Sequence, residues 1–279
     1  MTDVATVLKL IAADAQNGDI VFPTHAQIAL RVQRLLDDPD CPIDALTRLI
    51  GAEPVLATRM LTLANSTIYN PSGRRIDDIK TALTRIGFAG ARAIAAVVVI
   101  KQMQNMSPLS THRMLAAQLW KHTAHVAALA RVLARRVTRQ NPEAAFLAGI
   151  VHEIGNFYLI ARAGEFPGLL ERDLEILHGE GEAAIGRAVL AALDVPEEIG
   201  KALETLWTGY LAMPPRSLGD TLLLANQLAP IESPLDALTG ISSRGIPAEI
   251  ELLVNEETLT AVLAESGEEV NAMNSVLDG

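Results

Sequence analysis

The sequence is short of aromatic residues and of cysteine. Aromatic residues make up 4% of the 279 positions, and this disfavours the aromatic and β-branched strands of a β-sandwich. Cys41 is the only cysteine, so intramolecular disulfides and cysteine-rich zinc sites are excluded. A protein without these crosslinks fits a reducing cytoplasm, where we expect it to be.

Positive charge and long apolar runs are also scarce. The chain has 23 Lys and Arg against 33 Asp and Glu, a net charge of −10, so we expect neither nucleic acid nor membrane as a partner. The most apolar run, residues 93–100, is bounded by Arg92 and Lys101 and is far shorter than the roughly 20 residues of a membrane-spanning helix. The N-terminus, MTDVATVLKLIAADAQ, has the pattern of an amphipathic helix and not of a signal peptide.

Several common catalytic motifs are missing from the sequence. It contains no glycine-rich phosphate loop, no Gly-x-Ser-x-Gly elbow and no His-Glu-x-x-His motif. His25, His112 and His178 lie near predicted helix ends or loops, so we expect them at the surface. Any catalytic or metal site must therefore come from a less common pattern.

Apolar residues are abundant, at 49% of the chain, and the excess of alanine and leucine favours close-packed helices. Apolar residues recur at helical spacing along most of the chain, and no convincing alternating strand is found. We therefore predict an all-α protein. Helices are expected from Thr24, from Asp44 to Gly51, from Pro54, and at about 77–87 and 89–104.

The polar segment NMSPLST, residues 105–111, separates two helical blocks. We place a boundary there, giving an N-terminal helical lobe at 1–106 and a second block at 107–279, and the short connection predicts that the two pack together. The C-terminal tail GEEVNAMNSVLDG fits either a short acidic helix or a disordered segment. The sequence assigns no oligomeric state.

Two helices of the second block place histidines among apolar residues. His122 lies in the apolar stripe of a long helix that ends near Val137. Asn141 can cap the next helix, which carries FLAGIVHEIGN, and the apolar residues of that helix point in nearly every direction. His152 is therefore expected to be buried, beside Glu153. A buried imidazole and carboxylate need partners, so they are either satisfied core polar groups or metal ligands.

The stretch from residue 22 to 87, FPTHAQIALRVQRLLDDPDCPIDALTRLIGAEPVLATRMLTLANSTIYNPSGRRIDDIKTALTRIG, resembles the N-terminal part of HDOD domains. These are bacterial signalling modules related to the HD phosphohydrolases. The matching positions are Pro23, Glu53-Pro54, Asn65-Ser66 with Tyr69 shortly after, and Ile86-Gly87. LWKHTAHVAALARVLA and AAFLAGIVHEIGN are similar to the family's first-histidine helix and its His-Asp helix. The resemblance implies an N-terminal lobe packed on a degenerate HD-like helical core.

In the catalytic HD enzymes, a histidine, a His-Asp pair and a later aspartate bind divalent metal. The resemblance maps these ligands onto His122, His152, Glu153 and Asn226. Glutamate moves the ligand oxygens by one methylene, and asparagine offers a carbonyl oxygen without charge. Where two-metal relatives have further histidines, this chain has Glu182 and the pair Leu206-Trp207. These departures imply a weakened metal site.

The resemblance thus implies a non-catalytic regulatory or interaction module whose partner is a signalling protein of unknown identity, with no cofactor. The alternative is a phosphohydrolase that uses Mn, Mg or Fe and acts on a nucleotide or cyclic dinucleotide. In either case we expect His122 and His152 to approach each other. If no metal is bound, Lys121, His122 or Asn226 is expected to donate to Glu153.

Overall fold

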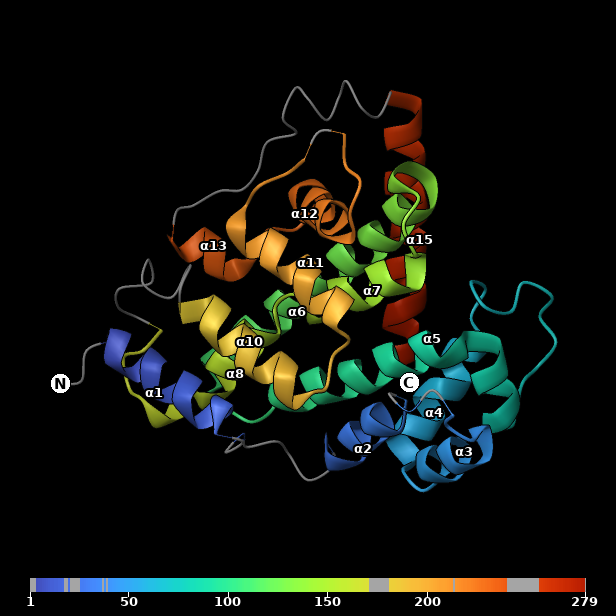
Figure 1. Ribbon diagram of the computed structural model, residues 1–279, viewed down its shortest axis with the longest axis horizontal. Helices are drawn as coiled ribbons and strands as arrows, with labels where there is room; N and C mark the ends of the chain where they lie inside the picture. Colours follow the sequence, from blue (N-terminus) through green and yellow to red (C-terminus); the bar gives the residue numbers. More distant parts are fainter. Residues whose placement is uncertain are drawn as a thin grey trace.

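Helices provide the regular secondary structure throughout the part of the chain that the computed structural model describes (Figure 1). The structure describes residues 4–17, 20, 26–36, 38, 40–170, 181–212, 214–239 and 256–278, and those ranges contain no strand. This confirms the predicted all-α class.

The helices of the N-terminal part are α1 (Val4–Gln16), α2 (Ala26–Leu36), α3 (Ile43–Gly51), α4 (Pro54–Ala64) and α5 (Ile79–Met103). Those that follow are α6 (Ser110–Leu133), the π-helix η1 (Ala134–Thr138), α7 (Pro142–Val151), α8 (Ile154–Arg162), the 3₁₀-helix η2 (Ala163–Glu165), α10 (Glu182–Ala192), α11 (Glu197–Thr208), α12 (Leu218–Leu228), α13 (Pro234–Thr239) and α15 (Glu256–Asp278).

The N-terminal lobe is built on α5, against which α2, α3 and α4 pack. Gly87 has φ 72° and ψ 175° and breaks the regular path of α5, a conformation that glycine adopts without steric cost. The prediction of two helices divided near this residue is therefore confirmed. Nearly every residue from 90 to 100 is buried, because this half of α5 runs between the lobe and the second block.

The loop between α4 and α5 is held by side-chain amides. Asn65 donates to the carbonyl oxygens of Leu61 at 2.9 Å and Ile76 at 2.7 Å, and it accepts from the Ile76 N–H at 2.8 Å. Asp78 then caps α5 by accepting from the Thr81 N–H at 2.8 Å. Asn65 thus caps the C-terminal end of α4.

The second block is arranged around α6, which packs against α7, α12 and α15 (Figure 1). Asn141 accepts hydrogen bonds from the Glu143 and Ala144 N–H groups, and Pro142 occupies the first turn of α7, as predicted. α1 packs against α10 of this block. Asp14 accordingly pairs with Arg162 at 3.2 Å. The division at residue 106 stays a prediction.

A buried arginine joins the lobe to the second block. Arg131 of α6 is 5% exposed, pairs with Glu143 and donates to the Tyr69 hydroxyl at 2.7 Å. It also faces Glu269 at 4.0 Å. Tyr69 belongs to the lobe and Glu269 to α15, so one guanidinium connects three regions of the chain. The tail GEEVNAMNSVLDG is helical as far as Asp278, because α15 runs through it, and this decides between the two expectations for it.

Two helical stretches are long and apolar enough to be considered as membrane spans. They are Ile79–Met103 and Pro142–Glu165, and 72% and 100% of their most apolar windows are buried inside the protein. Core helices pass the same length and composition test, so this is weak evidence for a membrane. The run at 93–100 is a buried helix, as predicted.

Candidate functional site

The described part of the chain brings His122, His152 and Glu153 together in its interior. They are 2%, 4% and 6% exposed, and one ligand atom from each lies within 4.8 Å of the others. The Nε2 atoms of the two histidines are 3.2 Å apart, which confirms that these residues meet. Glu153 Oε1 is 3.7 Å from His122 Nε2 and 3.9 Å from His152 Nε2.

A break between two helices positions His152 and Glu153. The sequence predicted one helix through FLAGIVHEIGN, and this is wrong: α7 ends at Val151 and α8 begins at Ile154. Glu153 has φ −99° and ψ 14°, a bridge conformation that is frequent at functional sites. No proline marks the break, so the apolar pattern alone could not reveal it.

Two glycines set the distances between the helices that carry the site. A Cβ on Gly149 would lie 2.4 Å from Ala127 Cα of α6, and one on Gly155 would lie 2.9 Å from Gly186 N of α10. Neither position has room for a larger residue, because the contact on each side is with backbone. α7 therefore approaches the helix of His122 closely, and α8 approaches the helix that begins at Glu182.

The hydrogen bonds of the imidazoles fix their protonation at Nδ1. His122 Nδ1 lies 2.7 Å from the Ile231 carbonyl oxygen, and His152 Nδ1 lies 2.7 Å from that of Gly149. A carbonyl oxygen only accepts, so each Nδ1 carries a hydrogen. The two Nε2 atoms then face each other without a hydrogen of their own in the neutral state. A cation placed between them would meet both lone pairs, and the carboxylate of Glu153 lies 3.7 Å and 3.9 Å from these nitrogens.

The electrostatics of this cluster follow from its burial. Burial lowers the pKa of His152 to about 4, against the opposing effect of Glu153. Burial also acts to raise the pKa of Glu153, but the imidazoles of His152 and His122 and the amide of Asn156 outweigh it, so this pKa is lowered. Glu153 is thus the anion of the cluster.

The donors to Glu153 differ in part from those expected. Asn156 Nδ2 donates to Glu153 Oε2 at 2.6 Å and to Glu182 Oε1 at 3.0 Å, bridging the two carboxylates. Lys121 is exposed, so its candidacy was wrong. The sequence reasoning missed Asn156, although its place three residues after Glu153 was a usable signal, because residues three apart are neighbours on a helix.

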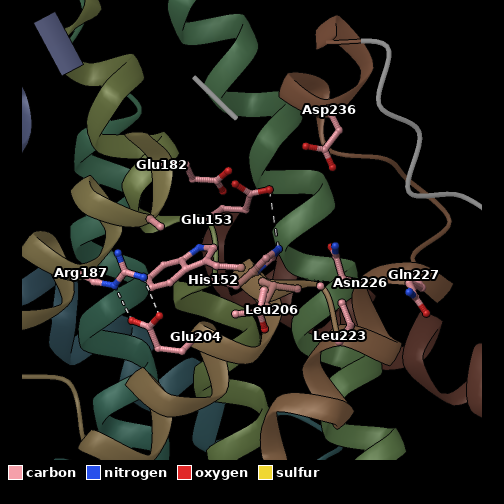
Figure 2. A pocket seen from close by; sticks show the side chains of 14 residues that line it. His152, Glu153, Glu182, Arg187, Glu204, Leu206, Leu223, Asn226, Gln227 and Asp236 are labelled. Carbon is pink, nitrogen blue, oxygen red and sulfur yellow. Dashed lines mark hydrogen bonds and ion pairs between the residues drawn. The ribbon is translucent and has the colours of Figure 1, made fainter. Parts of the chain in front are cut away.

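Asn226 of α12 lines the same pocket as His152 and Glu153 and lies beside His152 in Figure 2. Its Oδ1 is buried and has no hydrogen-bond partner among the described residues. Two nitrogens bound to one zinc ion at about 2.05 Å in tetrahedral geometry would be about 3.3 Å apart, close to the observed 3.2 Å between the Nε2 atoms. Backbone acceptors on both Nδ1 atoms are also usual for metal-binding histidines. His122, His152 and Glu153 therefore fit a divalent ion, and Asn226 lines the pocket beside them.

The pocket next to the cluster has a volume of about 910 Å³. The residues that line it are His152, Glu153, Glu182, Ala183, Arg187, Glu204, Leu206, Trp207, Thr208, Gly209, Leu223, Asn226, Gln227 and Asp236. Arg187 donates to both oxygens of Glu204, at 2.6 and 2.7 Å. Leu206 and Trp207 line this pocket, at the positions that the resemblance maps onto histidines of the two-metal relatives.

His112 was expected at the surface, and this prediction is wrong. It is 6% exposed, and its Nδ1 lies 3.0 Å from the Ser107 hydroxyl, because the turn before α6 folds back over it. His25 and His178 lie outside the described residues.

Comparison with known proteins places the chain in a family. The HDOD domain model matches residues 22–208, and the chain belongs to the HDOD domain family.

Solved structures share the fold. A proposed metal-dependent phosphohydrolase from Shewanella amazonensis SB2B has 23% identity and a TM-score of 0.71, over 98% of this chain and 100% of that one. A proposed signal transduction protein from Marinobacter aquaeolei VT8 has 18% identity and a TM-score of 0.60, over 98% of this chain and 65% of that one. An uncharacterized protein of Treponema pallidum (strain Nichols) is 25% identical over 68% of this chain, which spans 38% of that protein's length.

Proposed function

We propose that this HDOD chain is a non-catalytic regulatory or interaction module of bacterial signal transduction. The observation that carries the proposal is the charge of the pocket. Among the residues that the structure describes, four carboxylates line it, and the guanidinium of Arg187 is engaged by Glu204. Phosphoryl-transfer sites hold their substrates with cations, and no described arginine or lysine side chain of this pocket is left to bind a phosphate group.

The ligand set supports the same proposal. Asn226 stands where the resemblance expects an aspartate, so one negative charge that would hold a cation and acidify its bound water is absent from that position. Glu153 is already engaged by Asn156 at 2.6 Å. This hydrogen bond needs no metal ion, and the cluster joins α6 to the junction of α7 and α8.

The convergence of the two Nε2 atoms favours a second candidate, a phosphohydrolase acting on a nucleotide or cyclic dinucleotide. His122, His152 and Glu153, with Asn226, would hold a Mn, Mg or Fe ion, which when bound polarises a phosphoryl oxygen and activates water. The name of the Shewanella protein agrees with this candidate, and that of the Marinobacter protein agrees with the first.

For the partner we propose a signalling protein, in the cytoplasm, and neither nucleic acid nor membrane. The net charge of −10 supports this choice, because the chain as a whole repels phosphate backbones and anionic lipid.

Elemental analysis of the full chain, purified without chelator, separates the two candidates. On our proposal the protein carries far less than one equivalent of Mn, Fe, Zn or Mg. A full equivalent that is retained by the parent and lost in both His122→Ala and His152→Ala, with the helical circular dichroism unchanged, would favour the hydrolase. Asn105→Ala, at an exposed position, is the matched control.

A further inference from the structure

We propose that the face of α6 and η1 beneath α15 is a docking surface for a partner protein, which binds through an acidic amphipathic helix that takes the place of α15. This inference rests on the proposed function and deepens it, because it gives the chemical class of the signalling partner. α15 is then the chain's own occupant of its interaction surface.

α15 lies on both parts of the molecule. It packs against α6 of the second block and α4 of the lobe, and Figure 1 shows it in red, running past α6 toward the lobe. Its buried residues recur at helical spacing along one face and are Val262, Ser266, Glu269, Val270 and Met273. An amphipathic helix laid in a groove by such anchors is a recurring mode of peptide recognition. The face beneath α15 therefore already has a shape that holds a helix.

Three arginines on this face select for acidic residues. Arg135 donates to Glu265 and, at 3.3 Å, to Glu269, and Arg136 also donates to Glu265. Arg131 faces Glu269 at 4.0 Å. Two arginines four residues apart on one helix thus meet two glutamates four residues apart on another. The chain as a whole carries a net charge of −10, so this positive face is local, and charge complementarity makes an acidic helix its fitting partner.

Much of the face is held in place independently of α15. Arg131 donates to the Tyr69 hydroxyl at 2.7 Å and pairs with Glu143 of α7, so its guanidinium stays positioned when α15 leaves. Arg135 and Arg136, in contrast, have carboxylate partners only on α15 among the described residues. Removal of α15 would leave these two cations ready for the acids of another helix.

The attachment of α15 is weak enough to be replaced. Glu269 Oε2 and Arg131 Nε are buried and form no hydrogen bond among the described residues, which costs free energy in the docked state. Burial raises the pKa of Glu269 although Arg131 and Arg135 lower it, so its charge is compensated only in part. The side chains of Arg135 and Arg136 are 41% and 47% exposed, and ion pairs of this exposure are weak and screened by salt. A helix held in this way can open without unfolding the rest of the protein.

Fluorescence anisotropy of a labelled synthetic peptide, residues 256–279, titrated with the full chain at low ionic strength tests the proposal. In the parent, α15 competes from within the same chain, so we expect weak binding. Glu265→Arg in the chain places like charge against Arg135 and Arg136 and uncovers the face, so Kd for the peptide should fall by at least about tenfold. Glu268→Arg makes the same change at an exposed position of α15 and should change Kd by less than about twofold. A peptide that carries Glu265→Arg should bind the uncovered chain at least about tenfold more weakly than the parent peptide.

Hydrogen exchange measured by mass spectrometry on the unmodified chain gives a second readout that needs no variant. The amides of α15 should be at least about tenfold less protected than those of α7, and NaCl should lower the protection of α15 further, because α15 opens by itself and is held by ion pairs. Equal protection of α15 and α7 would overturn the proposal.

Equal peptide affinity of the parent and a Glu265→Arg chain with unchanged circular dichroism would overturn it as well. Light scattering should find one chain in each complex, and a complex of two chains would assign the face to a second copy and contradict the partner helix. Hydrolysis of p-nitrophenyl phosphate is measured on the same preparation: turnover there would contradict the proposed function, whereas failure of the peptide test without turnover would contradict only the docking surface.

Discussion

The amide of Asn156 should be the largest single stabiliser of the buried cluster. Asn156→Ala removes a 2.6 Å hydrogen bond to Glu153 and a 3.0 Å hydrogen bond to Glu182. Hydrogen bonds to charged groups contribute about 1.5–3 kcal/mol, and Glu153 is 6% exposed, so water replaces the lost donor only in part. We expect the variant to be destabilised by about 2 kcal/mol.

The magnitude is measurable by thermal unfolding. Unfolding entropy near 60 °C is about 2.1 cal/mol/K per residue, or about 0.6 kcal/mol/K for this chain, so a loss of about 2 kcal/mol lowers Tm by about 3–4 °C. Asn105→Ala, at an exposed position, is the control and should change stability by less than about 0.5 kcal/mol.

A double-mutant cycle with Glu153→Gln identifies the cause. If the bond depends on the carboxylate charge, Asn156→Ala should cost at least about 1 kcal/mol less when combined with Glu153→Gln than in the parent, which is a coupling of the size found for contacting residues. An equal cost in both backgrounds would refute the reasoning, because the asparagine would then act through packing alone.

Other buried positions give three more tests. Gly149→Ala should lower the free energy of unfolding in urea by about 3 kcal/mol, because the new methyl group meets the α6 backbone. The control is Gly51→Ala, whose methyl group meets nothing within 4 Å and should not destabilise the protein. Equal effects of the two substitutions would contradict the close approach of α7 to α6. Burial opposes ionisation of Asp220, but backbone N–H donors and the Ser217 hydroxyl outweigh burial and lower the pKa of this carboxyl group. The carboxylate therefore stabilises the fold at pH values above its unfolded pKa of about 3.9. This stabilisation is lost as the pH falls through the folded pKa. Asp220→Asn should therefore cost about 1–3 kcal/mol at pH 7 and progressively less below about pH 4, and a pH-independent difference would argue against it. Glu153→Asp with Asn226→Asp should unfold more easily than the parent without metal and gain thermal stability from Mn²⁺, because two close carboxylates repel until a cation binds; an unchanged melting curve in both conditions would mean that the two positions do not share a site.

Much of the fold can be predicted from helical periodicity. The all-α class, the cap at Asn141 and the division at Gly87 were readable because each depends on local sequence. The break at His152-Glu153 was not, since no proline marks it within an apolar run. Burial of His112 was missed for a similar reason, because it depends on a turn that folds back over the helix start.

The candidate site was predicted only through the family resemblance. Periodicity placed His122 and His152 in the interior, but it could not bring two helices to an Nε2–Nε2 distance of 3.2 Å. Periodicity could not predict the acidic pocket either, because Glu182 and Asp236 come from helices far apart in the sequence. Sets of residues that meet only in three dimensions need the structure.

Turnover is the most direct test of the central claim that this chain regulates without catalysis. The full chain is incubated with Mn²⁺, Mg²⁺ or Fe²⁺ and with a phosphomonoester, a phosphodiester and a cyclic dinucleotide, and product is measured by chromatography. We predict rates equal to the protein-free background with every metal. Metal-dependent product formation that disappears in a folded His152→Ala variant would contradict the account.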